Sequence, residues 1–118
     1  MTRATGAVEL DVVIPVRTGV EFLPEAVASA ATQIDATVHV IVVDDGADPD
    51  PAAMLAGVDG VHLTVIANSG PPGIAGARNA GAAVGRSPLL AFLDADDTWP
   101  ATRTARRQHR RSARQRSR

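Results

Sequence analysis

The stretch Thr37-Val38-His39-Val40-Ile41-Val42-Val43, followed by Asp44-Asp45-Gly46, decides the fold class of this 118-residue chain. Apart from His39, every residue before Asp44 is β-branched, and no polar alternation interrupts the run. Such a run is typical of a strand that is buried on both faces of a parallel sheet. Aspartate and glycine favour turns, so the strand is expected to end after Val43.

The segments on both sides of this run predict an alternation of strands and helices. Apolar β-branched runs indicate strands, and apolar residues at helical spacing indicate helices. The expected strands are 8–16, 37–43, 61–67 and 89–93, and the expected helices are 20–33, 51–56 and 73–84. The order β-α-β-α-β-α-β predicts an α/β fold with a mostly parallel sheet and helices on both faces.

Charge is distributed unevenly along the chain, although the net charge is only −1. All 13 acidic residues lie within residues 1–100, whereas 8 of the 12 basic residues, which are all arginine, lie in residues 101–118. This division predicts a folded domain over residues 8–100 and a basic, disordered tail over 101–118. The tail has no aromatic residue for base stacking, so a nucleic-acid partner is not favoured. A shifted reading frame or a truncated gene is the preferred explanation of the tail.

Composition argues against several other classes of protein. The chain has no cysteine, and therefore no disulfide framework and no thiolate metal site. No apolar run approaches the ~18–20 residues that a membrane-spanning helix requires. Residues 1–7 lack the apolar region of a signal peptide, so a cytoplasmic location is expected. His39, His62 and His109 show no metal-ligand spacing and are interpreted as structural or solvated.

Polar or turn residues follow each expected strand, which points to a site at one edge of the sheet. These stretches are Pro15-Val16-Arg17, Asp44-Asp45-Gly46, Asn68-Ser69-Gly70 and Asp94-Ala95-Asp96-Asp97. In α/β sheets, ligands bind outside the carboxyl ends of the strands, where such residues meet. The last stretch favours a divalent cation that carries phosphate oxygens, because hard cations prefer oxygen ligands. An isolated Asp-x-Asp would more simply be a solvated turn.

A glycine-rich loop, Gly70-Pro71-Pro72-Gly73-Ile74-Ala75-Gly76, leads into the third expected helix and places Arg78 in its first turns. The backbone N–H groups of a helix start can hold anions. The loop lacks the lysine of a Walker A motif and the glycine spacing of a dinucleotide-binding fingerprint. It is therefore expected to be a flexible connection unless Arg78 faces the same pocket as the strand ends.

Taken in order, these segments resemble the N-terminal half of a family 2 glycosyltransferase with the GT-A fold, a Rossmann-like α/β architecture. The residues behind the resemblance are Val13-Ile14-Pro15-Val16-Arg17, Val42-Val43-Asp44-Asp45-Gly46, Asn68-Ser69-Gly70, Ala77-Arg78-Asn79-Ala80-Gly81 and Phe92-Leu93-Asp94-Ala95-Asp96-Asp97-Thr98-Trp99-Pro100. Each motif alone is weak, but their order and spacing over residues 9–100 make the resemblance specific.

The resemblance implies transfer of a sugar from a nucleotide-diphosphate donor to an acceptor, which could be a glycan, a lipid or a small molecule. It also implies Mg²⁺ or Mn²⁺ as the cofactor. In this pattern Pro15 and Val16 would line the pocket for the base. Asp45, with Asp44 beside it, would contact the base, and Arg78 would lie near the base and the phosphates.

The same resemblance assigns roles to the later acidic residues. Asp94 would face the ribose, Asp96 would ligate the metal that bridges the diphosphate, and Asp97 would be a third, less clearly placed carboxylate. Arg17 is expected to bind substrate but departs from the pattern, because the family often has an aromatic residue there. No acidic residue follows Asp97, so the carboxylate that activates the acceptor is missing. The chain is thus expected to be a truncated donor-binding half, weakly active or inactive as given.

Two alternatives stay open at this point. A nucleotidyltransferase shares an α/β sheet and metal-binding carboxylates, but it would have a glycine-rich loop with a basic residue directly after the first strand. Arg17-Thr18-Gly19 is too sparse for such a loop. The other alternative is a non-catalytic fragment or a protein that binds nucleic acid through its basic tail. Salt-sensitive DNA binding that depends on residues 101–118 would favour this alternative.

Overall fold

The structure is a computed structural model that describes residues 8–105 and 114–115. Most of the expected basic tail, at 106–113 and 116–118, lies outside the described residues, as does His109. Among the described residues, no helix is long and apolar enough to cross a membrane. The cytoplasmic location and the domain boundary at residue 100 stay predictions.

A sheet of 5 strands in the order β3-β2-β1-β4-β5 forms the centre of the molecule. The strands are β1 (Val8–Val16), β2 (Ala36–Asp44), β3 (His62–Ala67), β4 (Leu89–Phe92) and β5 (Arg114–Gln115). The pairs β1–β2, β2–β3 and β1–β4 are parallel, and the short β5 pairs antiparallel with β4. The predicted, mostly parallel sheet is therefore confirmed. The sequence did not predict the additional strand β5.

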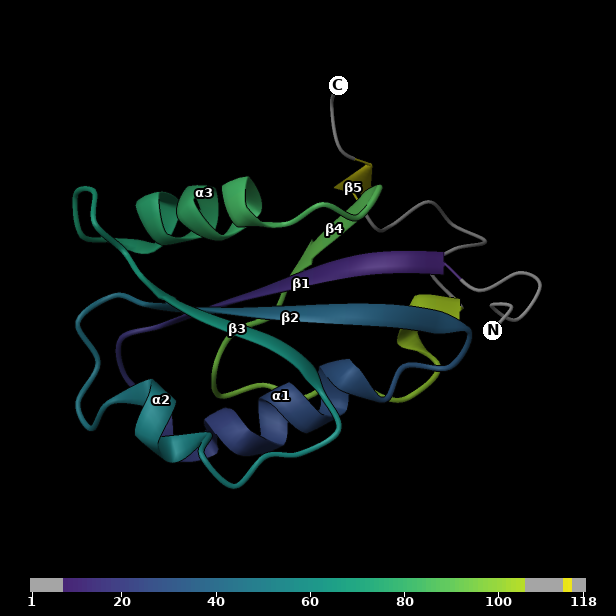
Figure 1. The fold of residues 1–118 in the computed structure, drawn as a ribbon, viewed down its shortest axis with the longest axis horizontal. Coiled ribbons are helices and arrows are strands. Elements are labelled where there is room, and N and C mark those ends of the chain that lie inside the picture. Colours follow the sequence, from purple (N-terminus) through teal and green to yellow (C-terminus); the bar gives the residue numbers. More distant parts are fainter. Residues whose placement is uncertain (1–7, 106–113, 116–118) are drawn as a thin grey trace.

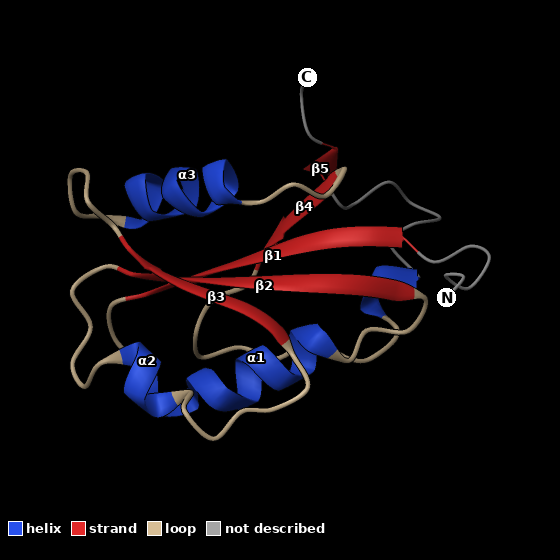
Figure 2. Cartoon of the chain, viewed as in Figure 1, coloured by secondary structure: helices blue, strands red, loops and turns tan. Residues whose placement is uncertain are grey.

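Helices cover both faces of this sheet, as predicted. Figure 1 shows α3 on one side and α1 and α2 on the other, and Figure 2 shows the same layers by type of structure. The helical elements are η1 (Val20–Phe22), α1 (Leu23–Ala31), α2 (Pro51–Met54) and α3 (Ile74–Val84). Pro24 lies in the first turn of α1, where its missing N–H leaves no hydrogen bond unmade. The helix expected over 20–33 is thus a 3₁₀ turn followed by an α-helix.

Alternate residues of the central strands pack into two separate apolar clusters. Val12 of β1 faces the cluster that contains α1, whereas Val13 faces the cluster that contains Ala77 of α3. In β2, Val42 and Val43 divide in the same way. Since successive side chains of a strand point to opposite faces, both faces must be apolar, which explains the uninterrupted β-branched run.

The helix α3 lies unusually close to the sheet at Gly81. A Cβ atom on Gly81 would overlap Val13 Cγ1 and would lie 3.0 Å from Val43 Cγ2. Ala77, one turn earlier, is fully buried. Two small residues therefore let α3 rest on β1 and β2, with its first turn beside the carboxyl ends of these strands.

Candidate functional site

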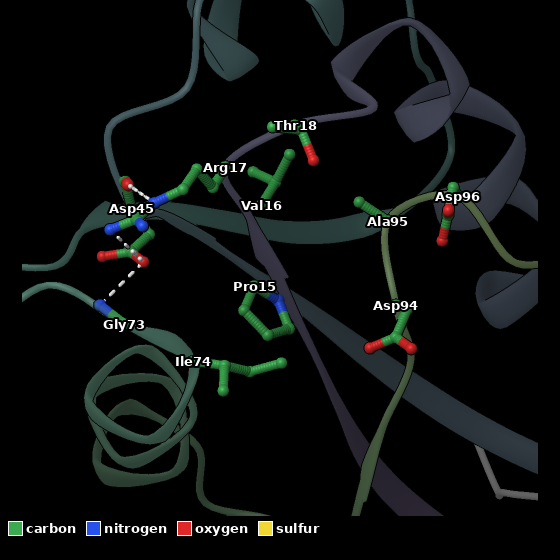
Figure 3. A pocket seen from close by; sticks show the side chains of 10 residues that line it. All are labelled: Pro15, Val16, Arg17, Thr18, Asp45, Gly73, Ile74, Asp94, Ala95 and Asp96. Atoms are coloured by element: carbon green, nitrogen blue, oxygen red, sulfur yellow. Dashed lines mark hydrogen bonds and ion pairs between the residues drawn. The ribbon is translucent and has the colours of Figure 1, made fainter.

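A cleft of about 280 Å³ opens at the carboxyl ends of β1, β2 and β4. The strand order reverses between β1 and β4, and α/β sheets bind their ligands at such a switch point. The volume is near the lower end of the roughly 300–1,000 Å³ usual for small-molecule sites. The lining residues, drawn in Figure 3, are Pro15, Val16, Arg17, Thr18, Asp45, Gly73, Ile74, Asp94, Ala95 and Asp96.

Asp45 is held on one side of the cleft by partners from three segments. Its Oδ1 accepts a hydrogen bond of 2.9 Å from Asn68 Nδ2. Its Oδ2 accepts one of 3.0 Å from Gly73 N, which is drawn in Figure 3. The Arg17 guanidinium lies 3.4 Å from Oδ2. The Asn68 hydrogen bond is the main cause that lowers the pKa of Asp45; Gly73 and Arg17 act the same way, and burial opposes them. Asp45 is therefore a fixed, ionised acceptor at neutral pH.

Asp44 takes a different role from its neighbour. Its Oδ1 accepts hydrogen bonds from Gly46 N at 3.0 Å and Ala47 N at 2.8 Å, which closes the turn after β2. Asp44 does not line the cleft. Adjacent residues of a strand point to opposite sides, and here Asp45 is the one on the cleft side.

Asp94 and Asp96 form the other side of the cleft (Figure 3). Both are exposed, whereas Ala95 between them is only 6% exposed and anchors the loop in the apolar cluster under α1. A backbone hydrogen bond of 3.0 Å from Asp97 N to Asp94 O closes the turn. Asp97 itself does not line the cleft.

The donor set of this loop fits a cation that arrives with a phosphate ligand. Within the part of the chain that the structure describes, no group of three or more His, Cys, Asp or Glu side chains could hold a metal on its own. Asp94 and Asp96 nevertheless offer exposed carboxylate oxygens on one loop. Mg²⁺ is commonly held by one or two carboxylates together with substrate phosphates rather than by a complete protein cage.

Arg78 lies next to the Asp94 side of the cleft rather than in its lining. Its Nη2 is 3.9 Å from Asp94 Oδ1, and its guanidinium carbon lies 5.2 Å from the centre of the Phe92 ring. Arg78 Nε is buried and makes no hydrogen bond with the described residues. The ion pair is long and half exposed, so it contributes little to stability.

A second polar group, the Asp11 cluster, consists of Asp11, His39, His62, Thr64 and Ser87. The fully buried Asp11 carboxylate accepts hydrogen bonds from Ser87 N at 3.1 Å and Ser87 Oγ at 2.8 Å. His39 Nδ1 lies 3.7 Å from Asp11, and its Nε2 hydrogen-bonds Thr64 Oγ1 at 2.7 Å. The His39 and His62 rings stack at 3.9 Å. Burial, and then the charge of His62, lower the pKa of His39, while Asp11 opposes them.

Comparison with known proteins identifies the family. The model of the glycosyl transferase family 2 matches residues 11–107. The chain belongs to this family. The succinoglycan biosynthesis protein ExoU of Rhizobium meliloti is 35% identical over 96 residues, which cover 80% of this chain and 28% of that protein. This chain thus spans less than a third of the length of that relative.

Solved structures show that this family 2 chain has the GT-A fold. A mannosyltransferase from Pyrobaculum calidifontis in complex with GDP-Man and Mn²⁺ matches with a TM-score of 0.72 at 20% identity, over 86% of this chain and 31% of that one. TarS of S. aureus in complex with UDP matches with a TM-score of 0.71 at 22% identity, over the same shares. These likenesses confirm the predicted fold class.

Some residues of the cleft received no individual role from the sequence. Thr18, Gly73 and Ile74 line it, and Asn68 supports Asp45. The sequence placed Asn68 at a strand end without giving it a role of its own, and the structure shows its side-chain amide beside the end of β2. Nothing in the sequence marks the Gly73 N–H as a partner of Asp45, because glycine has no side chain to suggest it.

Proposed function

We propose that the cleft binds the nucleoside-diphosphate part of a sugar donor for glycosyl transfer. The observation behind this proposal is the convergence of Pro15–Thr18, Asp45 and Asp94–Asp96 on one cleft at the switch point of a family 2 sheet. Fixed polar groups on opposite sides of a cleft suit a ligand with a hydrogen-bonding base at one end and anionic oxygens at the other.

The base is assigned to the Asp45 side. Asp45 is kept ionised by its hydrogen bonds and can accept a further N–H, such as that of a base. Pro15 and Val16 supply an apolar floor (Figure 3). The side chain of Arg17 is 55% exposed beside Asp45. A planar guanidinium can stack on a base or donate to its carbonyls, so it can serve where the family often has an aromatic residue.

The diphosphate and ribose are assigned to the other side. Asp96 would hold Mg²⁺ or Mn²⁺, which stabilises the negative charge of the diphosphate leaving group when bound. Asp94 would face the ribose, and Arg78 would turn its guanidinium from Asp94 towards a phosphate. Asp44 is assigned to the turn and not to ligand binding, because its carboxylate is used by Gly46 and Ala47.

Donor binding, rather than complete turnover, is the activity proposed for these residues. The residues that line the cleft are all assigned to the donor, and the base that deprotonates the acceptor is no part of this proposal. Likeness to structures that hold GDP-Man with Mn²⁺ and UDP supports a nucleotide ligand, but two different bases are represented.

Titration calorimetry of UDP, GDP and dTDP tests the proposal, with each ligand measured in Mn²⁺ and again in EDTA. We expect one nucleotide to bind the wild type more tightly with Mn²⁺, and Asp96→Ala to lose about 10–100-fold of the metal-supported affinity. The matched control is Asp59→Ala, an exposed aspartate in the loop before β3, which should bind like the wild type. If Asp96→Ala binds the nucleotide in Mn²⁺ as tightly as wild type, or if folded wild type binds no nucleotide, the assignment of Asp96 as a metal ligand is contradicted.

A further inference from the structure

Gln33, which follows the end of α1, hydrogen-bonds residues that come after the Asp94–Asp97 turn. Gln33 and Thr104 are only 5% and 2% exposed. The Gln33 Nε2 group donates to Ser29 O at 3.1 Å and to Pro100 O at 2.9 Å. Its Oε1 accepts from Thr104 N at 2.8 Å and from Thr104 Oγ1 at 2.9 Å. The side-chain amide thereby uses both donors and both acceptor sites, and its orientation is fixed by its partners.

Further contacts join the same two segments. Ser29 Oγ accepts a hydrogen bond of 3.1 Å from Trp99 N, and Ile34 N donates to Ala101 O at 2.9 Å. The Arg103 guanidinium carbon lies 3.8 Å from the centre of the Trp99 ring. We call the set formed by Ser29, Gln33 and Thr104 the α1 latch. It joins segments about 70 residues apart in the sequence.

The latch lies at one end of the loop that holds Asp94 and Asp96. The other end is fixed by β4, where Leu93 N donates to Val13 O at 3.0 Å. Between these ends, the buried Ala95 anchors the loop in the core, and the aspartates on both sides of it are exposed. The Trp99 amide, which the latch binds, comes two residues after Asp97.

We infer that the α1 latch is a positioning device that fixes the backbone of the Asp94–Asp97 turn, and with it the placement of the Asp94 and Asp96 carboxylates. An apolar contact would let residues 99–104 slide along α1, whereas the buried Gln33 amide with its four hydrogen bonds specifies a single register. Ligand-binding side chains must be held within about 0.5 Å of their productive positions. The part of this inference that concerns ligand binding rests on the function proposed above.

Amide hydrogen exchange tests the positioning role without any ligand. In Gln33→Ala, the Asp97 and Trp99 amides should exchange about tenfold faster than in wild type once rates are normalised to the amides of β2. Ser87→Ala is the matched control, since it removes a hydroxyl hydrogen bond from the Asp11 cluster. If the two variants give equal exchange at Asp97 and Trp99, the latch has only a general stabilising role and the inference is wrong.

A milder variant covers the case in which Gln33→Ala does not fold. Thr104→Val keeps the size of the side chain and removes only the hydroxyl donor to Gln33 Oε1. It should raise exchange at Asp97 and Trp99 above that of Ser87→Ala, and by less than Gln33→Ala does where both fold. Unchanged exchange in a folded Thr104→Val sample would also overturn the inference.

Binding of UDP, GDP or dTDP in Mn²⁺ and in EDTA then links the latch to the ligand. Gln33→Ala should lose about tenfold in Mn²⁺-supported affinity, as expected for a group that orients a metal ligand, while the affinity in EDTA stays within a factor of about two of wild type. Equal losses with and without Mn²⁺ would overturn the link to Asp96. If wild type binds no nucleotide, the proposed function fails, whereas the exchange data still decide whether the latch positions the turn.

Discussion

Asp11 and Asp96 are carboxylates carried by the same parallel sheet, but they differ in exposure and in partners. Asp11 is fully buried near the start of β1, where it accepts two hydrogen bonds from Ser87 and lies 3.7 Å from His39 Nδ1. Asp96 is exposed in the cleft at the opposite ends of the strands. A buried carboxylate whose partners lie within the chain maintains the fold, whereas an exposed carboxylate in a cleft is available to a ligand. The two regions should therefore respond differently to substitution.

The largest effect on stability is expected for Asp11→Ala. Ser87 would lose the acceptor of its N–H and of its hydroxyl, so the free energy of unfolding should fall by roughly 2–4 kcal/mol. Asp94→Ala is the control at the other end of the sheet, and its effect should stay within about 0.5 kcal/mol because the residue is exposed. Urea denaturation measures both. Similar losses in the two variants would remove the distinction between the regions.

A smaller loss is expected for Gly81→Ala, which acts on both regions through α3. The added Cβ would overlap Val13, and such overpacking costs about 1–3 kcal/mol. Alanine offsets roughly 0.5–1 kcal/mol of this through its better helix propensity. Because α3 begins beside Asp45 and ends before Ser87, a displaced helix should disturb both ends of the sheet.

Double-mutant analysis by urea denaturation separates this clash from other effects of the new methyl group. Val13→Ala removes the side chain that the Gly81→Ala methyl would overlap. The double variant should therefore be less destabilised than the sum of the two single variants, with a coupling of about 0.5–3 kcal/mol. Additive losses would show that the close approach of α3 to β1 is not the cause.

The sequence predicted the strands better than the contacts between them. The predicted strand 8–16 coincides with β1, and the run 37–43 gives β2 to within one residue at each end, because strands buried on both faces must be apolar throughout. The strand β5 had no such signal, since Arg-Gln is neither apolar nor β-branched. The pairing of Gln33 with Thr104 was equally hidden, because 71 residues separate them.

The candidate site was predictable to the level of strand ends and not beyond. The rule that ligands gather at the carboxyl ends of parallel strands located Asp45, Asp94 and Asp96, and all of them line the cleft. It did not show that Asp44 turns its carboxylate onto its own backbone. Neighbouring residues at a strand end point in different directions, and only the three-dimensional turn decides which of them faces the ligand.

The support of Asp45 can be tested through its pKa. Asn68→Ala removes the main cause of the lowered pKa, so the pKa of Asp45 should rise towards 3.8, as measured by NMR titration of its carboxyl carbon. Arg17→Ala should raise it less, because Arg17 is the smallest of the contributing causes and is half exposed. A larger rise in Arg17→Ala would reverse this ranking. Since the pKa is lowered, the stabilising contribution of Asp45 is present above pH 3.8 and is lost as the pH falls through the lower folded value.

The smallest effect is expected for His39, whose lowered pKa acts at a different pH. The unfolded chain takes up the proton at about pH 6.5, and the folded protein resists it until a lower pH. The free energy of unfolding should therefore be highest above pH 6.5 and fall as the pH drops towards the folded pKa. Urea denaturation of wild type and His39→Asn measures this slope, which should be shallower in the variant.

His62→Gln distinguishes the two causes of that slope. Burial is the larger cause of the lowered His39 pKa and the charge of His62 is the second, so His62→Gln should keep most of the wild-type pH slope. Equal slopes in wild type and His39→Asn would show that His39 does not cause the pH dependence. The contribution of His39 to the free energy of unfolding then falls from about pH 6.5 downwards. The contribution of Asp45 is kept until the pH falls below 3.8. Between these windows the cluster is weakened while Asp45 is still ionised. Nucleotide affinity measured there reports on the cleft with Asp45 ionised, while the folded protein is less stable than it is above pH 6.5.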